Sequence, residues 1–136
     1  MVPILDNADK LATGGGAPWS EHSHSEHPHG RPAVLPAPVH PATTLTGAGE
    51  LLRALAAPVR IAIVLQLRAG ERCVHELVET LDVAQPLISQ HLRVLKSARV
   101  VRGERRGREV VYRLADDHLA HIVLDAVAHA EEDNLR

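Results

Sequence analysis

The sequence has very few aromatic residues and a single cysteine, and both shortages exclude classes of protein. Aromatic residues make up 1% of the 136 residues, so a hydrophobic core must be built from Leu, Val, Ile and Ala. One cysteine cannot form an intrachain disulfide, which excludes a secreted disulfide scaffold. No apolar run approaches the roughly 20 residues that cross a bilayer, and the first 30 residues lack the apolar segment of a secretory signal. We therefore expect a cytoplasmic protein with no membrane partner.

The net charge of -2 conceals an uneven distribution along the chain. Residues 84–115 hold eight basic and two acidic side chains, whereas residues 116–136 hold six acidic side chains and one basic. The basic block attracts polyanions, and the acidic end, which also bears histidines, attracts cations. These two segments are therefore the first places to look for function.

Residues 1–46 are expected to form a disordered tail, because seven of the nine prolines lie there and apolar periodicity is absent. Five histidines also lie in this segment: His22, His24, His27, His29 and His40. Two interpretations stay open for the tail. It is either a solvated low-complexity segment or an auxiliary arm that captures metal.

Residues 47–136 are expected to form one domain, mainly α-helical with a β-hairpin wing. Apolar residues recur at helical spacing in five stretches, namely residues 50–56, 58–69, 73–81, 85–98 and 116–133. Val100 to Arg102 and Val110 to Leu114 alternate as strands do, and residues 103–108 between them form a turn with three arginines. The last helix carries an apolar stripe suited to a partner helix.

Two short helices joined by a tight break and followed by a basic hairpin predict a winged helix-turn-helix that binds double-stranded DNA. The helix that begins near Gln85 would enter the major groove, where short polar side chains reach base edges. The predicted DNA-binding residues of this helix are Gln85, Ser89, Gln90, His91, Arg93 and Lys96. In the hairpin they are Arg105, Arg106 and Arg108, which together with Arg93 and Lys96 would hold phosphates. Two alternatives stay open: a solvated basic face, and for His91 a structural hydrogen bond.

The last helix also presents a face of histidines and carboxylates that is distinct from its apolar stripe. At 100° per residue this face carries His118, His121, Asp125, His129 and Glu132. His118 and His129 are about 16 Å apart along a helix, whereas a zinc–nitrogen bond is only about 2 Å long. A single helix therefore cannot place both histidines on one ion.

Two antiparallel copies of this helix remove the obstacle, because residues that face each other across a twofold axis have a constant index sum. Asp116 then lies opposite Glu132, and His118 lies opposite His129. A homodimer would hold two ions, each bound by Asp116 and His118 of one chain and by His129 and Glu132 of the other. This ligand set suits tetrahedral Zn(II), with Co(II) as a substitute, whereas Ni(II) would need further nitrogen ligands.

A second cluster consists of Cys73, His75 and Glu76, of which Cys73 and Glu76 share one helix face. It is a candidate accessory metal site, and a tail histidine could complete it. The alternative is that Cys73 is a buried core residue, the more common role of a lone cysteine on a helix.

The sequence resembles the ArsR/SmtB family of metal-sensing winged-helix repressors over roughly residues 45–135. The resemblance is carried by RCVHELVE, AQPLISQHLRVLKSARVV, GERRGREVVYRL and DDHLAHIVLDAVAHAEED. The last segment contains the family's Asp-x-His-x10-His-x-x-Glu sensing pattern at Asp116, His118, His129 and Glu132, and the likeness is greatest to zinc-responsive SmtB-type members of actinobacteria. The resemblance implies a homodimer that binds an inverted-repeat operator without metal and releases it when metal binds.

The sequence departs from the family pattern in places that bear on metal choice and DNA contact. Cys73-Val74-His75 replaces the Cys-Val-Cys of the arsenic, lead and cadmium sensors, and Pro86 stands where many members have Ser. A nickel- or cobalt-responsive regulator and a metal-independent, redox-responsive regulator remain as alternatives. An enzyme with a small-molecule substrate is not expected, because the proposed ligands fill all four metal positions.

Overall fold

The computed structural model describes residues 30–135, and backbone contacts divide the chain into two units that meet between Ala48 and Gly49. In the first unit, residues 31–41 are exposed and irregular, and helix α2 (Ala42–Leu55) begins after them. The carbonyl of Pro41 accepts the first helical hydrogen bond from the Leu45 N–H at 3.1 Å. The helix therefore begins earlier than the expected stretch of residues 50–56 and includes residues 42–46, which were expected to belong to the tail. The tail histidines His22, His24, His27 and His29 lie outside the described residues.

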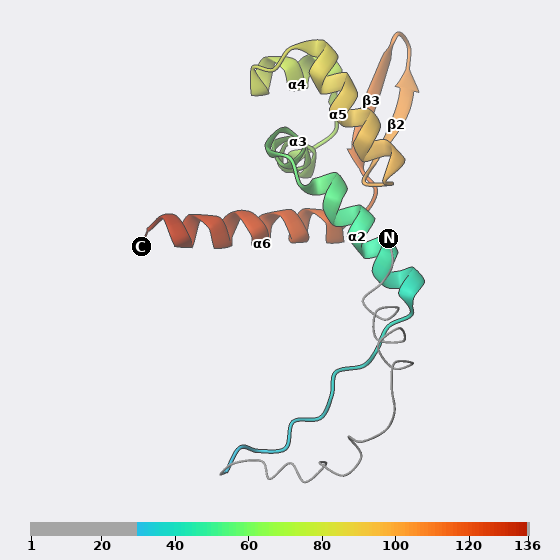
Figure 1. Cartoon of the computed structure of the whole chain (residues 1–136). Coiled ribbons are helices and arrows are strands. Elements are labelled where there is room, and N and C mark those ends of the chain that lie inside the picture. Colours follow the sequence, from blue (N-terminus) through green and yellow to red (C-terminus); the bar gives the residue numbers. More distant parts are fainter. Residues whose placement is uncertain (1–29, 136) are drawn as a thin grey trace, which may run out of the picture. The chain divides into compact units, whose positions relative to one another are not determined.

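The second unit contains the end of α2 followed by a mainly helical fold with a small sheet (Figure 1). Its further elements, in chain order, are α3 (Pro58–Ala69), β1 (Arg72–Cys73), α4 (Val74–Leu81), α5 (Gln85–Ser97), β2 (Val101–Arg106), β3 (Glu109–Leu114) and α6 (Asp117–Asn134). This order confirms the predicted fold class, a winged helix-turn-helix. None of the helices within residues 30–135 is both long and apolar enough to span a membrane.

Helices α4 and α5 form the helix-turn-helix, and a residue with left-handed backbone geometry separates them. Asp82 follows α4 with a φ of 54°, and its N–H donates to the Val78 carbonyl at 2.9 Å. Helix α5 then begins with a proline in its first turn, where the missing N–H costs nothing. The face of α5 that repeats at helical spacing, namely Ile88, Leu92 and Leu95, is fully buried. The core therefore fixes which side of α5 is left for solvent.

The sheet has three antiparallel strands in the order β1-β3-β2. The hairpin turn is shorter than the six residues expected, because Arg105 and Arg106 pair with Val110 and Glu109 and extend both strands. Gly107, with a φ of 64°, makes the remaining two-residue turn together with Arg108. The short strand β1 was not expected, since two residues are too few to show alternation.

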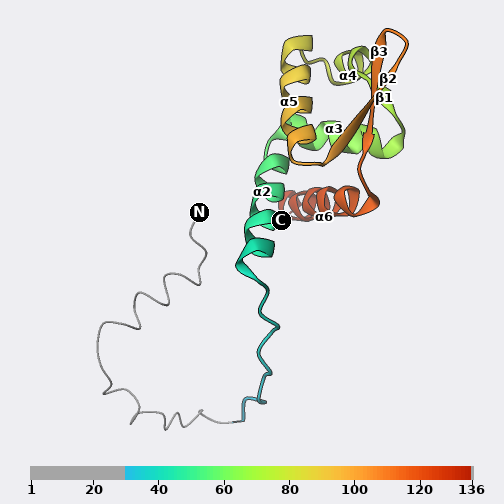
Figure 2. The same cartoon turned by 90° about the vertical axis from the view of Figure 1, so that its right-hand side faces the viewer.

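Helix α6 packs on α3 through its first half, with Leu119, Ala120 and Val123 buried. Its start is fixed by Asp116, whose Oδ1 accepts a hydrogen bond from the Leu119 N–H at 3.3 Å. The hairpin of β2 and β3 stands beside α5, and its turn lies at the end of the unit remote from α6 (Figures 1 and 2). The wing and the last helix therefore occupy opposite ends of this unit.

Candidate nucleic-acid interface and metal sites

Helix α5 presents its polar side chains on the face opposite the core. Gln85, Gln90, Arg93 and Lys96 are exposed, and Ser89 is half-buried at the edge of the same face. This exposure follows from burial of the Ile88, Leu92 and Leu95 row, because the two faces of an amphipathic helix are set together. The face has the side chains and the accessibility that major-groove readout needs, and its individual DNA contacts stay predictions.

His91 has a structural partner within the chain. Its Nδ1 atom accepts a hydrogen bond from the Arg60 guanidinium Nη1 at 3.2 Å, which assigns the proton of a neutral ring to Nε2. The Arg60 Nε atom also donates to the carbonyl of Ala54. The contact links α3 to the middle of α5, so the structural interpretation of His91 has a direct observation behind it.

The three wing arginines differ in what surrounds them. The Arg106 guanidinium lies 2.8 and 3.3 Å from the two carboxylate oxygens of Glu71 and 3.1 Å from Glu104, and these carboxylates raise its pKa. Within residues 30–135, neither Arg105 nor Arg108 forms an ion pair, and both are exposed at the tip. The positive charge of Arg106 is therefore compensated by carboxylates of the same chain, whereas the charges of Arg105 and Arg108 are available to bind phosphate.

The four ligands predicted on the last helix are exposed and do not converge within one chain. The side chains of His118 and His129 are 93% and 77% exposed. His118 Nδ1 lies 3.5 Å from Asp116 Oδ1 at one end of α6, and His129 Nε2 lies 3.6 Å from Asp133 Oδ2 near the other end. Glu132 is exposed beside His129. Each end thus holds a histidine–carboxylate pair open to solvent, and one straight helix keeps the pairs apart.

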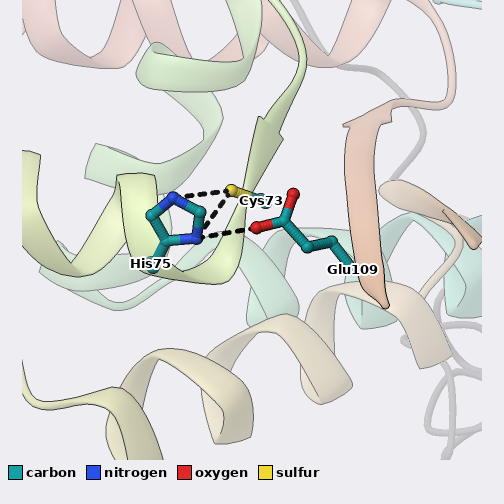
Figure 3. A group of neighbouring side chains, drawn as sticks. All are labelled: Cys73, His75 and Glu109. Carbon is teal, nitrogen blue, oxygen red and sulfur yellow. Dashed lines mark hydrogen bonds and ion pairs between the residues drawn. The ribbon is translucent and has the colours of Figure 1, made fainter. Parts of the chain in front are cut away.

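Cys73, His75 and Glu109 do converge within one chain (Figure 3). Cys73 Sγ lies 3.1 Å from His75 Nδ1, and the same nitrogen lies 3.2 Å from Glu109 Oε1. Among the described residues this is the one group of at least three ligand side chains whose ligand atoms all lie within 4.8 Å of one another. Glu109 was not among the predicted site residues, because only the pairing of β1 with β3 brings it to Cys73.

Glu76, predicted as the third member of this cluster, is hydrogen-bonded to Cys73 in the structure. Its Oε1 accepts hydrogen bonds from the Cys73 backbone N–H and from the Cys73 thiol, both at 3.0 Å. These bonds lower the pKa of Glu76, the backbone bond most. A carboxylate at this position satisfies a backbone donor at the start of α4, so Glu76 caps the helix and orients the cysteine.

The Cys73 thiol is buried, and burial raises its pKa, as does its hydrogen bond to the Glu76 carboxylate. A thiol with a raised pKa holds little thiolate near neutral pH, and the thiolate is the form that oxidants attack. The environment of Cys73 therefore counts against a redox-responsive regulator whose switch is this residue.

Comparison with known proteins gives the same picture over most of the chain. Residues 57–102 match the family described as bacterial regulatory protein, arsR family. The chain is 68% identical over 112 residues to the HTH-type transcriptional repressor SmtB of Mycobacterium tuberculosis, covering 82% of each protein, and 42% identical over 84 residues to the HTH-type transcriptional regulator NmtR of the same organism, covering 62% of this chain and 70% of NmtR.

Solved structures agree with the fold. The transcriptional repressor BigR from Xylella fastidiosa superposes with a TM-score of 0.57 at 32% identity, over 61% of this chain and 85% of that one. A homodimeric winged helix-turn-helix domain of a possible ArsR-family regulator from Mycobacterium bovis gives 0.62 at 26% identity, over 73% and 92%. The chain therefore belongs to the ArsR family, as a DNA-binding transcriptional repressor closely similar to SmtB and not as an enzyme.

Proposed function

We propose that this repressor is a homodimeric zinc sensor. The metal-free dimer binds an inverted-repeat operator, and Zn(II) bound between paired α6 helices lowers its affinity for DNA. The observation that carries the proposal is the arrangement of the last helix, which places exposed Asp116 and His118 at one end and exposed His129 and Glu132 near the other. The two pairs are too distant to share an ion within a chain, but they meet across an antiparallel twofold axis.

The surface of α6 supports pairing with a second copy. The apolar stripe of this helix is buried on α3 only in its first half, whereas Ala126 and Ala130 are exposed and Val127 is half-buried. Small side chains allow two helices to approach closely, and an isologous contact uses the same patch on both subunits. We therefore place the dimer axis near the middle of α6, with the second half of its stripe against the partner.

The donor set of each shared site favours zinc. Asp116 and His118 of one chain and His129 and Glu132 of the other would supply two carboxylate oxygens and two imidazole nitrogens. Four such ligands suit tetrahedral Zn(II), which would clamp the two helices at a fixed distance and angle, and Co(II) would substitute for it. Ni(II) prefers a richer nitrogen set, and the exposed His121 on the same helix is the nearest source of a third imidazole.

On the DNA side, two copies of α5 would enter successive major grooves while the wings hold flanking phosphates. A metal-induced change in the angle between the subunits alters the spacing of the two reading helices. By linkage, metal weakens DNA binding by the same factor by which DNA weakens metal binding. That factor is typically about 5 to 150 for coupled sites.

Titration of Zn(II) into a fluorescently labelled operator–dimer complex tests this proposal. We expect the wild type to lose affinity by a factor within that range, and we expect His118→Ala and His129→Ala to keep their affinity at every zinc concentration. His121→Ala is the matched control, because it removes an exposed histidine of the same helix that is outside the four ligands. An unchanged affinity in the wild type would contradict zinc sensing, and a loss of the zinc response in His121→Ala would contradict the proposed set of four ligands, because His121 would then be needed as well.

A further inference from the structure

Arg60 of α3 contacts two other helices at once, and one of them is the helix expected to enter the major groove. We propose that Arg60 positions α5 for operator binding, that it acts through His91, and that neither side chain contacts DNA. This role rests on the DNA-binding function of the family and not on zinc sensing. It makes Arg60 a determinant of DNA specificity that lies outside the reading surface.

The Arg60 guanidinium uses all three of its nitrogen atoms. Its Nε donates to the Ala54 carbonyl and its Nη2 lies 3.5 Å from the Arg53 carbonyl, both in the last turn of α2. Its Nη1 donates to His91 Nδ1 at 3.2 Å. Carbonyls in the last turn of a helix lack their usual partner, and the fixed fork of a guanidinium satisfies them while it still reaches α5.

His91 lies on a different side of α5 from the side chains expected to meet DNA. At 100° per residue, with Ser89 at zero, Arg93 falls at about 40° and Lys96 at about 340°. His91 falls at about 200°, next to the buried Leu95 at about 240°, and is half-buried. Its ring therefore faces the interior beside the core row, where the Arg60 contact holds it.

The packing of α5 leaves a task for this contact. A hollow of about 500 Å³ separates the end of α2 from the second half of α5; it is lined by Glu50, Arg53, Ala54, Arg93, Val94, Ser97 and Ala98. The core row holds the inner face of α5, but a helix held along one row can still turn about that row. Arg60 links Ala54, in the lining of the hollow, to the flank of α5, and so limits this rotation.

The consequence concerns base readout more than phosphate contact. Hydrogen bonds to base edges need side chains held to within about 0.5 Å, so a turn of α5 would misplace Ser89 and Gln90. Phosphate contacts carry no sequence information, and flexible cationic side chains tolerate a small turn. Loss of the Arg60 contact should therefore weaken binding to the operator more than binding to DNA of another sequence.

Fluorescence anisotropy with two duplexes tests the proposal in full-length protein with a chelator present. One duplex is an operator that the wild type selects from a random pool, and the other is a scrambled duplex of equal composition. We expect Arg60→Gln and His91→Leu each to lose at least about 10-fold in operator affinity, which corresponds to one good base contact. We expect the affinity for scrambled DNA to stay within about 2-fold and the salt slope to stay unchanged, because no phosphate contact is removed.

Two further variants separate positioning from charge and from bulk. Arg68→Gln is the matched control, because it removes an exposed arginine in the last turn of the same helix and should bind both duplexes like the wild type. His91→Asn should recover most of the affinity lost in His91→Leu. Asn carries its oxygen on the γ carbon, as His carries Nδ1, and can accept from Arg60, whereas Leu has a similar size but no acceptor.

The double variant Arg60→Gln/His91→Leu decides whether the two residues act as one contact. We expect it to lose no more operator affinity than either single variant. Losses that multiply would overturn the proposal, since His91 would then act on DNA by itself. Wild-type operator affinity in Arg60→Gln would also overturn it, as would equal losses on both duplexes.

Urea unfolding shows which variants are folded under the assay conditions. If Arg60→Gln does not fold, His91→Asn and His91→Leu decide the outcome alone, and equal operator affinity in these two would overturn the proposal. Zinc is absent throughout, so the result is independent of whether α6 senses metal.

Discussion

The group of Cys73, His75 and Glu109 (the Cys73 cluster) and the ligand set of α6 contain similar residues, but they are assembled in different ways. Pairing of β1 with β3 brings the side chains of Cys73 and Glu109 together within one chain, although the two residues are distant in sequence. The α6 set lies on one continuous helix, and its two histidines are kept about 16 Å apart by the helical rise. The ligand atoms of the first region therefore meet within one chain, whereas those of the second could meet only if another copy of the chain supplied half of them.

Because of this difference, an ion at one region would affect DNA binding in another way than an ion at the other region. An ion at the Cys73 cluster would contact only one subunit, whereas an ion shared by two α6 helices would act between subunits. Only the second can change the distance between two reading helices, since that distance is a property of the dimer. We therefore propose α6, and not the Cys73 cluster, as the sensing site.

Mixed dimers give the largest effect expected from this comparison. His118→Ala alone and His129→Ala alone should each abolish tight zinc binding at both α6 sites of a homodimer. When the two variants are mixed, a dimer with one chain of each kind keeps one complete site, because the intact His118 of one chain faces the intact His129 of the other. Equilibrium dialysis with differently tagged, co-purified heterodimers should therefore show one tight zinc ion regained per mixed dimer.

The same design includes its own control. All chains in this experiment also carry Cys73→Ser. The Cys73 cluster then contributes no zinc, and the number of zinc ions bound per dimer reports α6 alone. A mixed dimer that regains no zinc would show that the histidines act within one chain, and the contrast between the two regions would be lost.

A second prediction compares a core residue of α5 with an exposed ligand residue of α6 by their effect on the free energy of unfolding of the metal-free protein. Leu92 of α5 is 1% exposed in the core, so Leu92→Ala should lower the free energy of unfolding by about 2 to 5 kcal/mol. His118 is 93% exposed, and His118→Ala should change it by less than about 0.5 kcal/mol. Urea unfolding at one fixed protein concentration with a chelator present measures both, and a large loss in His118→Ala would mean that the α6 face has a structural role.

A third prediction distinguishes the wing arginines from one another. Arg105→Ala and Arg108→Ala should each reduce the salt dependence of operator binding by about one unit of the log–log slope, because each removes one phosphate contact. Arg106→Ala should reduce it less, since Glu71 and Glu104 already neutralise its guanidinium. Fluorescence anisotropy over a range of salt concentrations provides the slopes, and three equal reductions would contradict the distinction.

The sequence was sufficient where the determining pattern is local. The spacing of Leu87 or Ile88, Leu92 and Leu95 predicts the helix and most of its buried face, because helical periodicity is visible over about two turns. The structure buries Ile88 and leaves Leu87 half exposed. The short β1 strand and the contact of Glu109 with Cys73 were not predictable, since strand pairing over a long separation leaves no local signal. The compensation of Arg106 by Glu71 was missed for the same reason.

The smallest effect is expected at Glu76, and it tests the role of this carboxylate as a helix cap. Glu76→Ala in metal-free protein removes the acceptor of the Cys73 N–H and should slightly destabilise α4, whereas Glu79→Ala, at an exposed position outside this cap, should not. The folded pKa of Glu76 lies below its ordinary value, so its contribution is present above the unfolded pKa of about 4.3 and is lost as the pH falls through the folded value. Urea midpoints should therefore separate Glu76→Ala from the wild type at neutral pH and converge in acid. A difference that persists unchanged in acid would mean that the ionised carboxylate is not what stabilises the start of α4.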